Sequence, residues 1–256
     1  MISREQLKRI AVDTGLNLYQ QEKDYLLKLF IYLYYKSYQS AVFKGGTYLK
    51  YALNLDRFSE DLDFNISNPV KFKKQVKRTL LNLRNTGIIN YFIKEELFKS
   101  SYTCEIGFEG PLYNGNIQTR NKFRIDAGYR IGTLKNPEWK LIKSEYPETG
   151  HNFLVYALSL EEILIEKIIA LFQRRKGRDL YDVWFMINAG VKFNKKIFNK
   201  KSKGKLNIEN IPTKQDYTRD ISKLTNKMLP YNQLKKDILL FIKKSKIIDR
   251  KWPSKG

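Results

Sequence analysis

Apolar residues in the first half of the chain follow two different periods, which predicts a mixture of helices and strands. Between Leu18 and Tyr38 they recur every three or four residues, as in a helix that packs against a sheet. We expect further helices at 4–13, 47–53 and 72–86. Shorter apolar or alternating runs predict strands at 41–44, 62–66, 89–95, 102–108 and 122–127.

The second half of the pattern is predominantly helical. Ser159 and Glu162 have the spacing of a capping box. Helices are expected at 160–174, 179–189, 214–228 and 232–245, whereas the polar segment 137–150 predicts irregular structure. The chain is therefore predicted to have an α+β fold, with a mixed sheet and flanking helices in residues 1–157 and a helical bundle in residues 158–256.

The charge of the chain changes this picture by suggesting a partner. The 256 residues include 48 Lys and Arg against 26 Asp and Glu, a net charge of +22. Basic surfaces bind phosphate backbones with release of counterions, so the excess favours a nucleic acid. The alternative is AT-rich coding, because Asn, Ile and Tyr are abundant as well. Segment 191–208 is the best candidate for an RNA-contacting strip, or else a solvated loop; its lysines are Lys192, Lys195, Lys196, Lys200, Lys201, Lys203 and Lys205.

Other chemistry and locations are disfavoured by composition. A single cysteine, Cys104, cannot form an internal disulfide. A catalytic thiol at Cys104 would need a histidine, and the only one in the chain is His151. The longest apolar stretch, Tyr25 to Tyr35, is interrupted by Lys28 and is far shorter than the ~20 residues that span a bilayer. With 42% hydrophobic residues and no recognisable secretory signal, we expect a folded, cytoplasmic protein without a membrane partner.

The most informative segment is VFKGGTYLKYALNLDRFSEDLDFNI, from Val42 to Ile66. Gly45 and Gly46 allow a turn with exposed backbone N–H groups, and a helix that starts at Thr47 would present its positive end to a phosphate. Asp61 and Asp63 lie two apart in a predicted strand, so their side chains share one face. Two carboxylates beside a phosphate-binding turn can form a binding site for Mg²⁺.

This order of elements resembles the opening of the polymerase-beta-like nucleotidyltransferases. The string FKGGT…L…RFSEDLDF is similar to one branch of them, the AbiEii/AbiGii toxin nucleotidyltransferase family. The resemblance implies a polymerase-beta-like fold, an NTP substrate and two Mg²⁺ ions bound by Asp61 and Asp63. A third carboxylate on a neighbouring strand completes such a site, and Asp126 is the candidate; the alternative is that Asp126 pairs with Arg124 or Arg130.

The helix predicted at 160–174 carries a lysine at an unexpected position. Lys167 falls at the edge of its apolar face, whereas Glu162, Glu166 and Gln173 fall on the solvent side. Lys167 either extends outward or reaches an anion in a cleft. Asp179 and Asp182, three apart, share a face of the next helix with apolar residues. The alternative is that Asp179 is an N-cap and Asp182 its companion in the first turn.

The string EEILIEKIIAL…RRKGRDLYDVW is similar to a second block of the same toxin family. By that resemblance Lys167 is a catalytic and nucleotide-binding residue, and Asp179 or Asp182 completes the site or orients a donor. Gly45, Gly46, Thr47 and Lys167 would then hold the nucleotide phosphates.

Together these features predict a metal-dependent nucleotidyltransferase that moves NMP from an NTP to RNA and releases pyrophosphate. The resemblance further implies a toxin of a toxin–antitoxin or abortive-infection system with a cognate antitoxin, and the charge makes the 3′ end of tRNA a candidate acceptor. Two alternatives remain open: a protein AMP- or UMP-transferase, and a basic RNA-binding module without catalysis.

Overall fold

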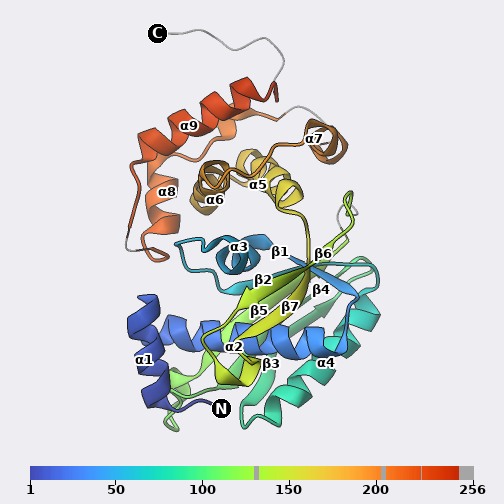
Figure 1. The fold of residues 1–256 in the computed structure, drawn as a ribbon, viewed down its shortest axis with the longest axis vertical. Helices are drawn as coiled ribbons and strands as arrows, with labels where there is room; N and C mark the ends of the chain where they lie inside the picture. The colour runs from blue at the N-terminus through green and yellow to red at the C-terminus, as the bar shows by residue number, and fades with distance from the viewer. Residues whose placement is uncertain (130–132, 203–205, 226, 248–256) are drawn as a thin grey trace. The chain divides into compact units, whose positions relative to one another are not determined.

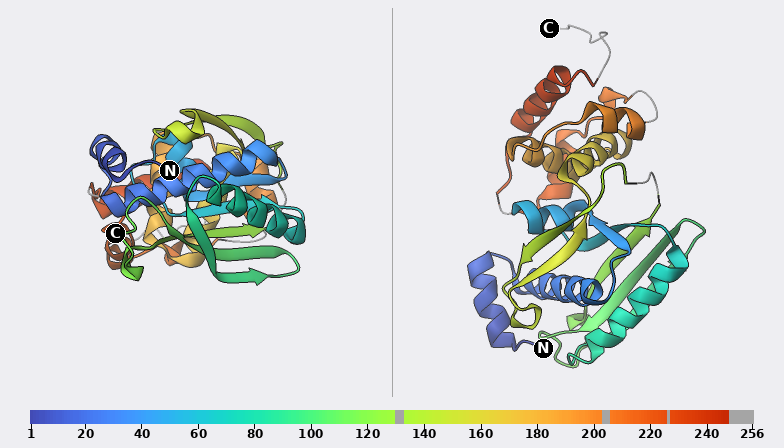
Figure 2. Two further views of the ribbon diagram at one scale, coloured as in Figure 1. Left: turned by 90° about the horizontal axis from the view of Figure 1, so that it is seen from below. Right: turned by 45° about the vertical axis from the view of Figure 1, so that its right-hand side comes forward.

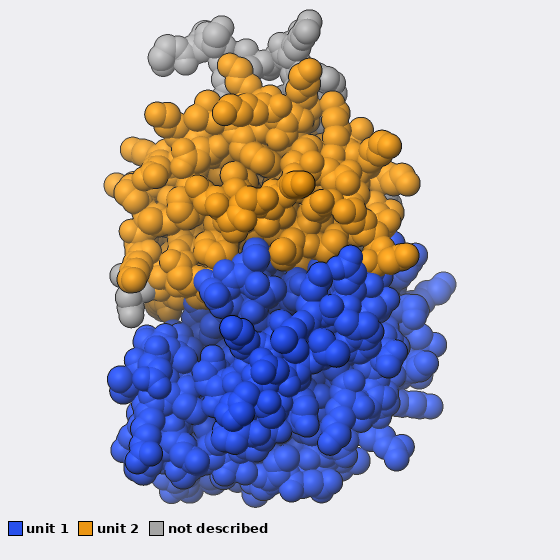
Figure 3. Space-filling model, viewed as in Figure 1, with its two compact units in different colours: residues 1–54, 58–133, 137–158 blue, residues 55–57, 134–136, 159–256 orange. Residues whose placement is uncertain are grey.

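The structure is a computed structural model that describes residues 1–129, 133–202, 206–225 and 227–247. The chain divides into two compact units (Figure 3). Unit 1 comprises residues 1–54, 58–133 and 137–158, and unit 2 comprises residues 55–57, 134–136 and 159–256. Unit 2 is therefore not a single continuous stretch, because the chain enters it twice before residue 159.

Unit 1 is built around a seven-stranded mixed sheet with the order β3-β4-β5-β2-β1-β7-β6. β1 runs parallel to β7 and β2 parallel to β5, and the other neighbours are antiparallel. The strands are β1 (Ala41–Lys44), β2 (Asp61–Ile66), β3 (Ile89–Leu97), β4 (Ser101–Glu109), β5 (Asn121–Gly128), β6 (Glu138–Lys143) and β7 (Asn152–Ala157).

Two long helices cover one face of this sheet. α2 (Leu18–Ser37) and α4 (Pro69–Arg84) lie side by side against it (Figures 1 and 2). Aromatic residues of α2 pack on those of the strands and of α4: the ring of Tyr34 contacts Phe64 on β2 and Phe72 on α4, and Phe30 contacts Phe123 on β5. Because this face is apolar and buried, the opposite face of the central strands is left to polar side chains. The remaining helices of unit 1 are α1 (Arg4–Thr14), α3 (Gly45–Leu53) and the short helices η1 (Ile117–Thr119) and η2 (Pro147–Thr149).

Unit 2 is helical in its continuous part. Its elements are α5 (Leu160–Arg174), α6 (Gly177–Asn188), α7 (Lys195–Ser202), η3 (Ile208–Asn210), α8 (Lys214–Ile221) and α9 (Tyr231–Lys244). α6 packs against α5, α8 and α9, and α7 packs against α5. The α+β fold is confirmed by these elements and by structural relatives described below.

Several expectations about individual elements were wrong. Segment 137–150 contains strand β6, an edge strand in which only Ile142 is buried, so its sequence shows almost no apolar alternation. The helix predicted at 214–228 ends at Ile221. The lysine-rich segment 191–208 is not a loop throughout, because it contains α7. No helix in the described residues is long and apolar enough to cross a membrane.

The carboxylate of Glu162 is buried rather than directed to solvent. Ser159 caps α5 by accepting from the Glu162 backbone N–H, but the Glu162 side chain does not return this bond. It accepts instead from the backbone N–H groups of Leu134 and Lys135 and pairs with buried Lys201 at 2.7 Å. Glu166, half-buried, also pairs with Lys201 at 2.6 Å. The amphipathic pattern predicted the wrong face because a buried cation inside unit 2 supplies the partner.

Candidate functional site

The turn at Gly45 lies directly against a carboxylate of the predicted metal site. α3 begins at Gly45, two residues before the predicted start, and Gly45 has a φ of +82°. A Cβ at this position would overlap the side chain of Asp63. Glycine is therefore required here twice, for its backbone conformation and for the close approach of Asp63. The N-cap residue, Lys44, has no side-chain acceptor to offer the first N–H groups of α3.

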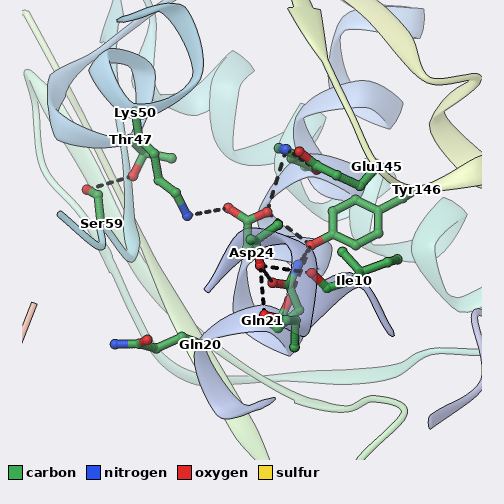
Figure 4. Close-up of polar contacts among 12 residues, drawn as sticks. Ile10, Gln20, Gln21, Asp24, Thr47, Lys50, Ser59, Glu145 and Tyr146 are labelled. Carbon is green, nitrogen blue, oxygen red and sulfur yellow. Dashed lines mark hydrogen bonds and ion pairs between the residues drawn. The ribbon is translucent and has the colours of Figure 1, made fainter. Parts of the chain in front are cut away.

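The Thr47 side chain contacts the segment that leads into β2. This side chain is buried, and its hydroxyl lies 2.9 Å from the Ser59 hydroxyl (Figure 4). The same hydroxyl lies 2.5 Å from the backbone carbonyl oxygen of Asp61. The hydroxyl therefore ties α3 to the beginning of β2. The phosphate contact predicted for this hydroxyl stays a prediction, and the backbone of Gly45 and Gly46 is also suited to that role.

The predicted acidic residues share one face of the central strands. Asp63 pairs in register with Asp126 of β5 and with Lys44 of β1, and Asp61 pairs with Arg124. Cross-strand partners project to the same side of a sheet, and so do residues two apart in a strand. Leu62 and Phe64 project to the buried side. This polar face therefore carries Asp61, Asp63 and Asp126, beside the Gly45 turn.

Asp126 already has partners within the fold. Arg124 Nη2 donates to Asp126 Oδ1 at 2.9 Å, Arg124 Nε lies 2.9 Å from Oδ2, and the Thr103 hydroxyl donates to Oδ1 at 3.0 Å. The alternative pairing with Arg124 is thus observed, whereas Arg130 lies outside the described residues. In the described part of the chain no group of three or more His, Cys, Asp or Glu residues is arranged to hold a metal ion. The two β2 carboxylates have the oxygen donors that Mg²⁺ prefers, and the metal role of Asp126 stays a prediction.

The second group of predicted residues forms a buried charge cluster in unit 2. Lys167 Nζ of α5 lies 2.7 Å from Asp182 Oδ2 and 3.3 Å from Asp179 Oδ1 on α6. Arg174 Nη2 lies 3.1 Å from both oxygens of Asp179. Both carboxylates are fully buried, and Lys167 is 13% exposed. Lys167 therefore points inward to two anions. The N-cap of α6 is Lys176, which removes the capping role considered for Asp179.

Arg57 belongs to this cluster and was not predicted from the sequence. Its Nε and Nη2 donate to the two oxygens of Asp182 at 2.6 and 2.7 Å. Burial alone would raise the pKa of Asp182, but Arg57 and Lys167 lower it well below its ordinary value. Asp182 likewise raises the pKa of Lys167 against the effect of burial. A sequence signal existed, because Arg57 lies within the string RFSEDLDF.

The predicted residues thus fall into two groups. Gly45, Gly46, Thr47, Asp61, Asp63 and Asp126 lie in unit 1, around the start of α3 and the polar face of β2 and β5. Lys167, Asp179 and Asp182 lie together in unit 2 with Arg57 and Arg174.

Comparisons with known proteins identify a family and similar folds for this chain. Residues 34–252 match a family model described as nucleotidyl transferase AbiEii toxin, type IV toxin–antitoxin system. The nucleotidyltransferase toxin MenT4 from Mycobacterium tuberculosis H37Rv has a similar fold, with a TM-score of 0.69 and 17% identity over 93% of this chain and 87% of that one. JHP933 from Helicobacter pylori has a TM-score of 0.60 and 21% identity over 96% and 95% of the respective chains. None of the curated proteins matches.

Proposed function

Since the chain belongs to the AbiEii family of nucleotidyltransferase toxins, we propose that it transfers a nucleoside monophosphate from an NTP to RNA in a metal-dependent reaction. The observation that carries this proposal is the placement of Asp63 against the Gly45 turn, with Asp61 on the same face of β2. The Gly45 turn would attract a triphosphate, but the two neighbouring carboxylates would repel it unless a divalent cation lies between them.

Asp61 and Asp63 would hold two Mg²⁺ ions, and Asp126 would join them if Arg124 released it. When bound, the metal supplies neutralisation of the triphosphate and polarisation of the acceptor hydroxyl. The backbone N–H groups at Gly45 and Gly46 would orient the phosphates, and the positive end of α3 favours their charge. Thr47 would hold Asp61 in place through the backbone carbonyl of that residue.

The reaction is an in-line substitution at the α-phosphorus. A bond forms between the acceptor oxygen and the α-phosphorus, the α–β phosphoanhydride bond breaks, and pyrophosphate leaves with the electron pair. The acceptor proton passes to solvent. Such chemistry depends on positioning and charge neutralisation rather than on a dedicated base, which fits a chain with one histidine.

Lys167 would contribute positive charge to the triphosphate. In its cluster the Lys167 ammonium lies beside the carboxylates of Asp179 and Asp182, which are also bound by Arg174 and Arg57. Asp179 and Asp182 would set the direction of the Lys167 ammonium.

RNA is the proposed acceptor because of the net charge of +22, and the 3′ end of tRNA is our first candidate. We further propose a cognate antitoxin, as expected for a type IV toxin, and action in the cytoplasm. A protein hydroxyl is the alternative acceptor.

The test is incubation of the purified protein with each α-³²P-labelled NTP and separate pools of tRNA and protein. We expect label on tRNA with wild type and none with Asp61→Asn or Asp63→Asn. Glu105→Gln is the matched control. It removes a carboxylate on β4 that projects to the same face of the sheet as Asp61 and Asp63, and we expect it to keep transfer. Label on protein alone would contradict the RNA acceptor, and full transfer by Asp63→Asn would contradict the proposed site.

A further inference from the structure

Two adjacent residues of α2 are buried although both are charged, and each contacts a different part of the proposed nucleotide site. Lys23 Nζ lies 2.5 Å from Oε2 of Glu60, the residue directly before Asp61. Asp24 Oδ1 accepts from Lys50 Nζ at 2.9 Å, and Lys50 belongs to α3, the helix that starts at Gly45 (Figure 4). α2 therefore holds both segments that carry the site.

A third contact closes a ring among these segments. The Thr47 hydroxyl of α3 contacts the Asp61 carbonyl and Ser59, as described above. α2 is thus joined to α3, α3 to segment 59–61, and that segment back to α2. Because each segment is held by two of the three contacts, none can shift without breaking one of them.

The ring of contacts among α2, α3 and segment 59–61 contains buried charged residues, although apolar residues could be buried there with a smaller desolvation penalty. Asp24 also accepts from the Tyr146 hydroxyl at 3.0 Å and lies 3.7 Å from Lys28. Burial would raise the pKa of Asp24, but Lys50 and Lys28 lower it, so the carboxylate is ionised. Buried ion pairs contribute little net stability compared with apolar side chains of similar volume, whereas their directional contacts restrict geometry.

We propose that Lys23 and Asp24 are positioning residues, which fix the β2 carboxylates relative to the Gly45 turn. The inference rests on the proposed function, since it assigns these contacts a role in the same site. Neither residue is assigned a contact with the nucleotide, and both act through Glu60 and Lys50.

The chain supplies a matched control for the first contact. Lys28, also on α2, lies 2.5 Å from Glu145 Oε2, and the exposed fractions of the two pairs are nearly equal: 6% and 41% for Lys28 and Glu145, 6% and 46% for Lys23 and Glu60. Glu145 lies between β6 and η2, not in α3 or segment 59–61. Loss of either pair should therefore cost similar stability, and only the loss of Lys23–Glu60 should affect catalysis.

The experiment compares Glu60→Gln with Glu145→Gln by melting temperature and by steady-state transfer of labelled nucleotide. We expect similar melting temperatures, and for Glu60→Gln alone a fall of about tenfold or more in kcat with little change in KM for the NTP. The double variant Lys23→Met/Glu60→Gln should lose no more kcat than Glu60→Gln alone, because the two substitutions remove the same ion pair. Lys23→Arg, which keeps charge and reach, should retain most of kcat.

Lys50→Met tests the second contact, between Lys50 and Asp24. It replaces Glu60→Gln as the test if circular dichroism shows that Glu60→Gln is unfolded. Lys50→Met keeps the aliphatic stem of Lys50, breaks the pair with Asp24, and should lower kcat in the same way. Equal kcat for wild type, Glu60→Gln and Lys50→Met, with active wild type, would overturn the positioning proposal while leaving the function intact. Wild type without transfer to any acceptor would contradict the proposed function itself.

Discussion

The guanidinium of Arg57 donates two hydrogen bonds to the carboxylate of Asp182, 125 positions later in the chain. Lys167 approaches the same carboxylate at 2.7 Å. A residue from the short connection between α3 and β2 is thus part of the charge cluster in unit 2. The cluster is fully buried at Asp182, so each contact there bears strongly on stability.

Arg57→Met is therefore expected to destabilise unit 2 strongly. The variant keeps much of the buried volume but leaves Asp182 with Lys167 as its cationic partner, and breaking a buried pair costs about 3–5 kcal/mol. Urea denaturation measures the change in the free energy of unfolding. Arg219→Met is the control, because the 62% exposed guanidinium of Arg219 pairs with Asp216 and Asp220 on α8, and its loss should cost far less stability. Equal losses would contradict this view of Asp182.

The Asp182 carboxylate should also make the stability of the protein sensitive to acid. Despite its burial, Arg57 and Lys167 hold the pKa of Asp182 well below the value of about 3.9 that an unfolded chain gives it. The unfolded state therefore binds the proton more readily, and the stabilisation is complete above about pH 4 to 5 and is lost as pH falls toward the folded pKa. The free energy of unfolding should fall more steeply below about pH 4 in wild type than in Asp182→Asn. Parallel curves would show that Asp182 does not carry this dependence.

Gly45→Ala should abolish nucleotide transfer. Its Cβ would overlap the Asp63 side chain and strain a backbone with positive φ, so either the turn or the carboxylate must move. Gly15→Ala is the control, since Gly15 also has a positive φ, of +71°, but no neighbour within 4 Å. Both variants should lose similar stability from backbone strain, and only Gly45→Ala should lose activity. Transfer at the wild-type rate in Gly45→Ala would count against a site at this turn.

Thr47→Val tests whether the hydroxyl positions Asp61. The substitution keeps the shape of the side chain but removes the donor to the Asp61 carbonyl, and an unpaired buried group costs about 1–3 kcal/mol. We expect reduced stability and reduced kcat, with both restored in Thr47→Ser. Stability is followed by thermal melting and kcat by transfer of labelled nucleotide. A loss confined to NTP affinity would instead favour direct contact of Thr47 with phosphate.

The lysines of α7 should divide into two functional classes. Lys195, Lys196 and Lys200 are exposed, whereas Lys201 is buried between Glu162 and Glu166. Combined replacement of the three exposed lysines by Ala should weaken tRNA binding and reduce its salt dependence without loss of stability. Lys201→Met should lower stability with little direct effect on RNA. Fluorescence anisotropy at several salt concentrations measures the former, and unchanged binding by the triple variant would remove this strip as an RNA contact. Lys203 and Lys205 lie outside the described residues.

The sequence predicted most elements because their local signals agree with their packing. Ser3 and Gln6 form a capping box at the start of the helix expected at 4–13, and the strand that carries Asp61 and Asp63 keeps its apolar residues on one side. β6 was missed because an edge strand with one buried side chain has no apolar period to detect. Its place in the sheet depends on pairing with β7, which local sequence does not encode.

The candidate site was predictable where a motif was continuous and not where partners come from distant segments. Asp179 and Asp182 share a buried face, as their spacing predicted. The string RFSEDLDF contains Arg57 but does not indicate its partner, because the pairing with Asp182 depends on the tertiary fold. For the same reason Glu162 was placed on the wrong face: its partner, Lys201, lies in a different helix.

The division of the chain into two units affects how the helical unit can be expressed by itself. A recombinant fragment that begins at residue 159 omits the tripeptide 55–57, and with it both Arg57 and Asp56, the acceptor for the Tyr181 hydroxyl. The truncated polypeptide would bury Asp182 without its guanidinium partner. A circular permutation or a linker that restores the tripeptide is a sounder route to an isolated unit 2 than simple deletion of the N-terminal half.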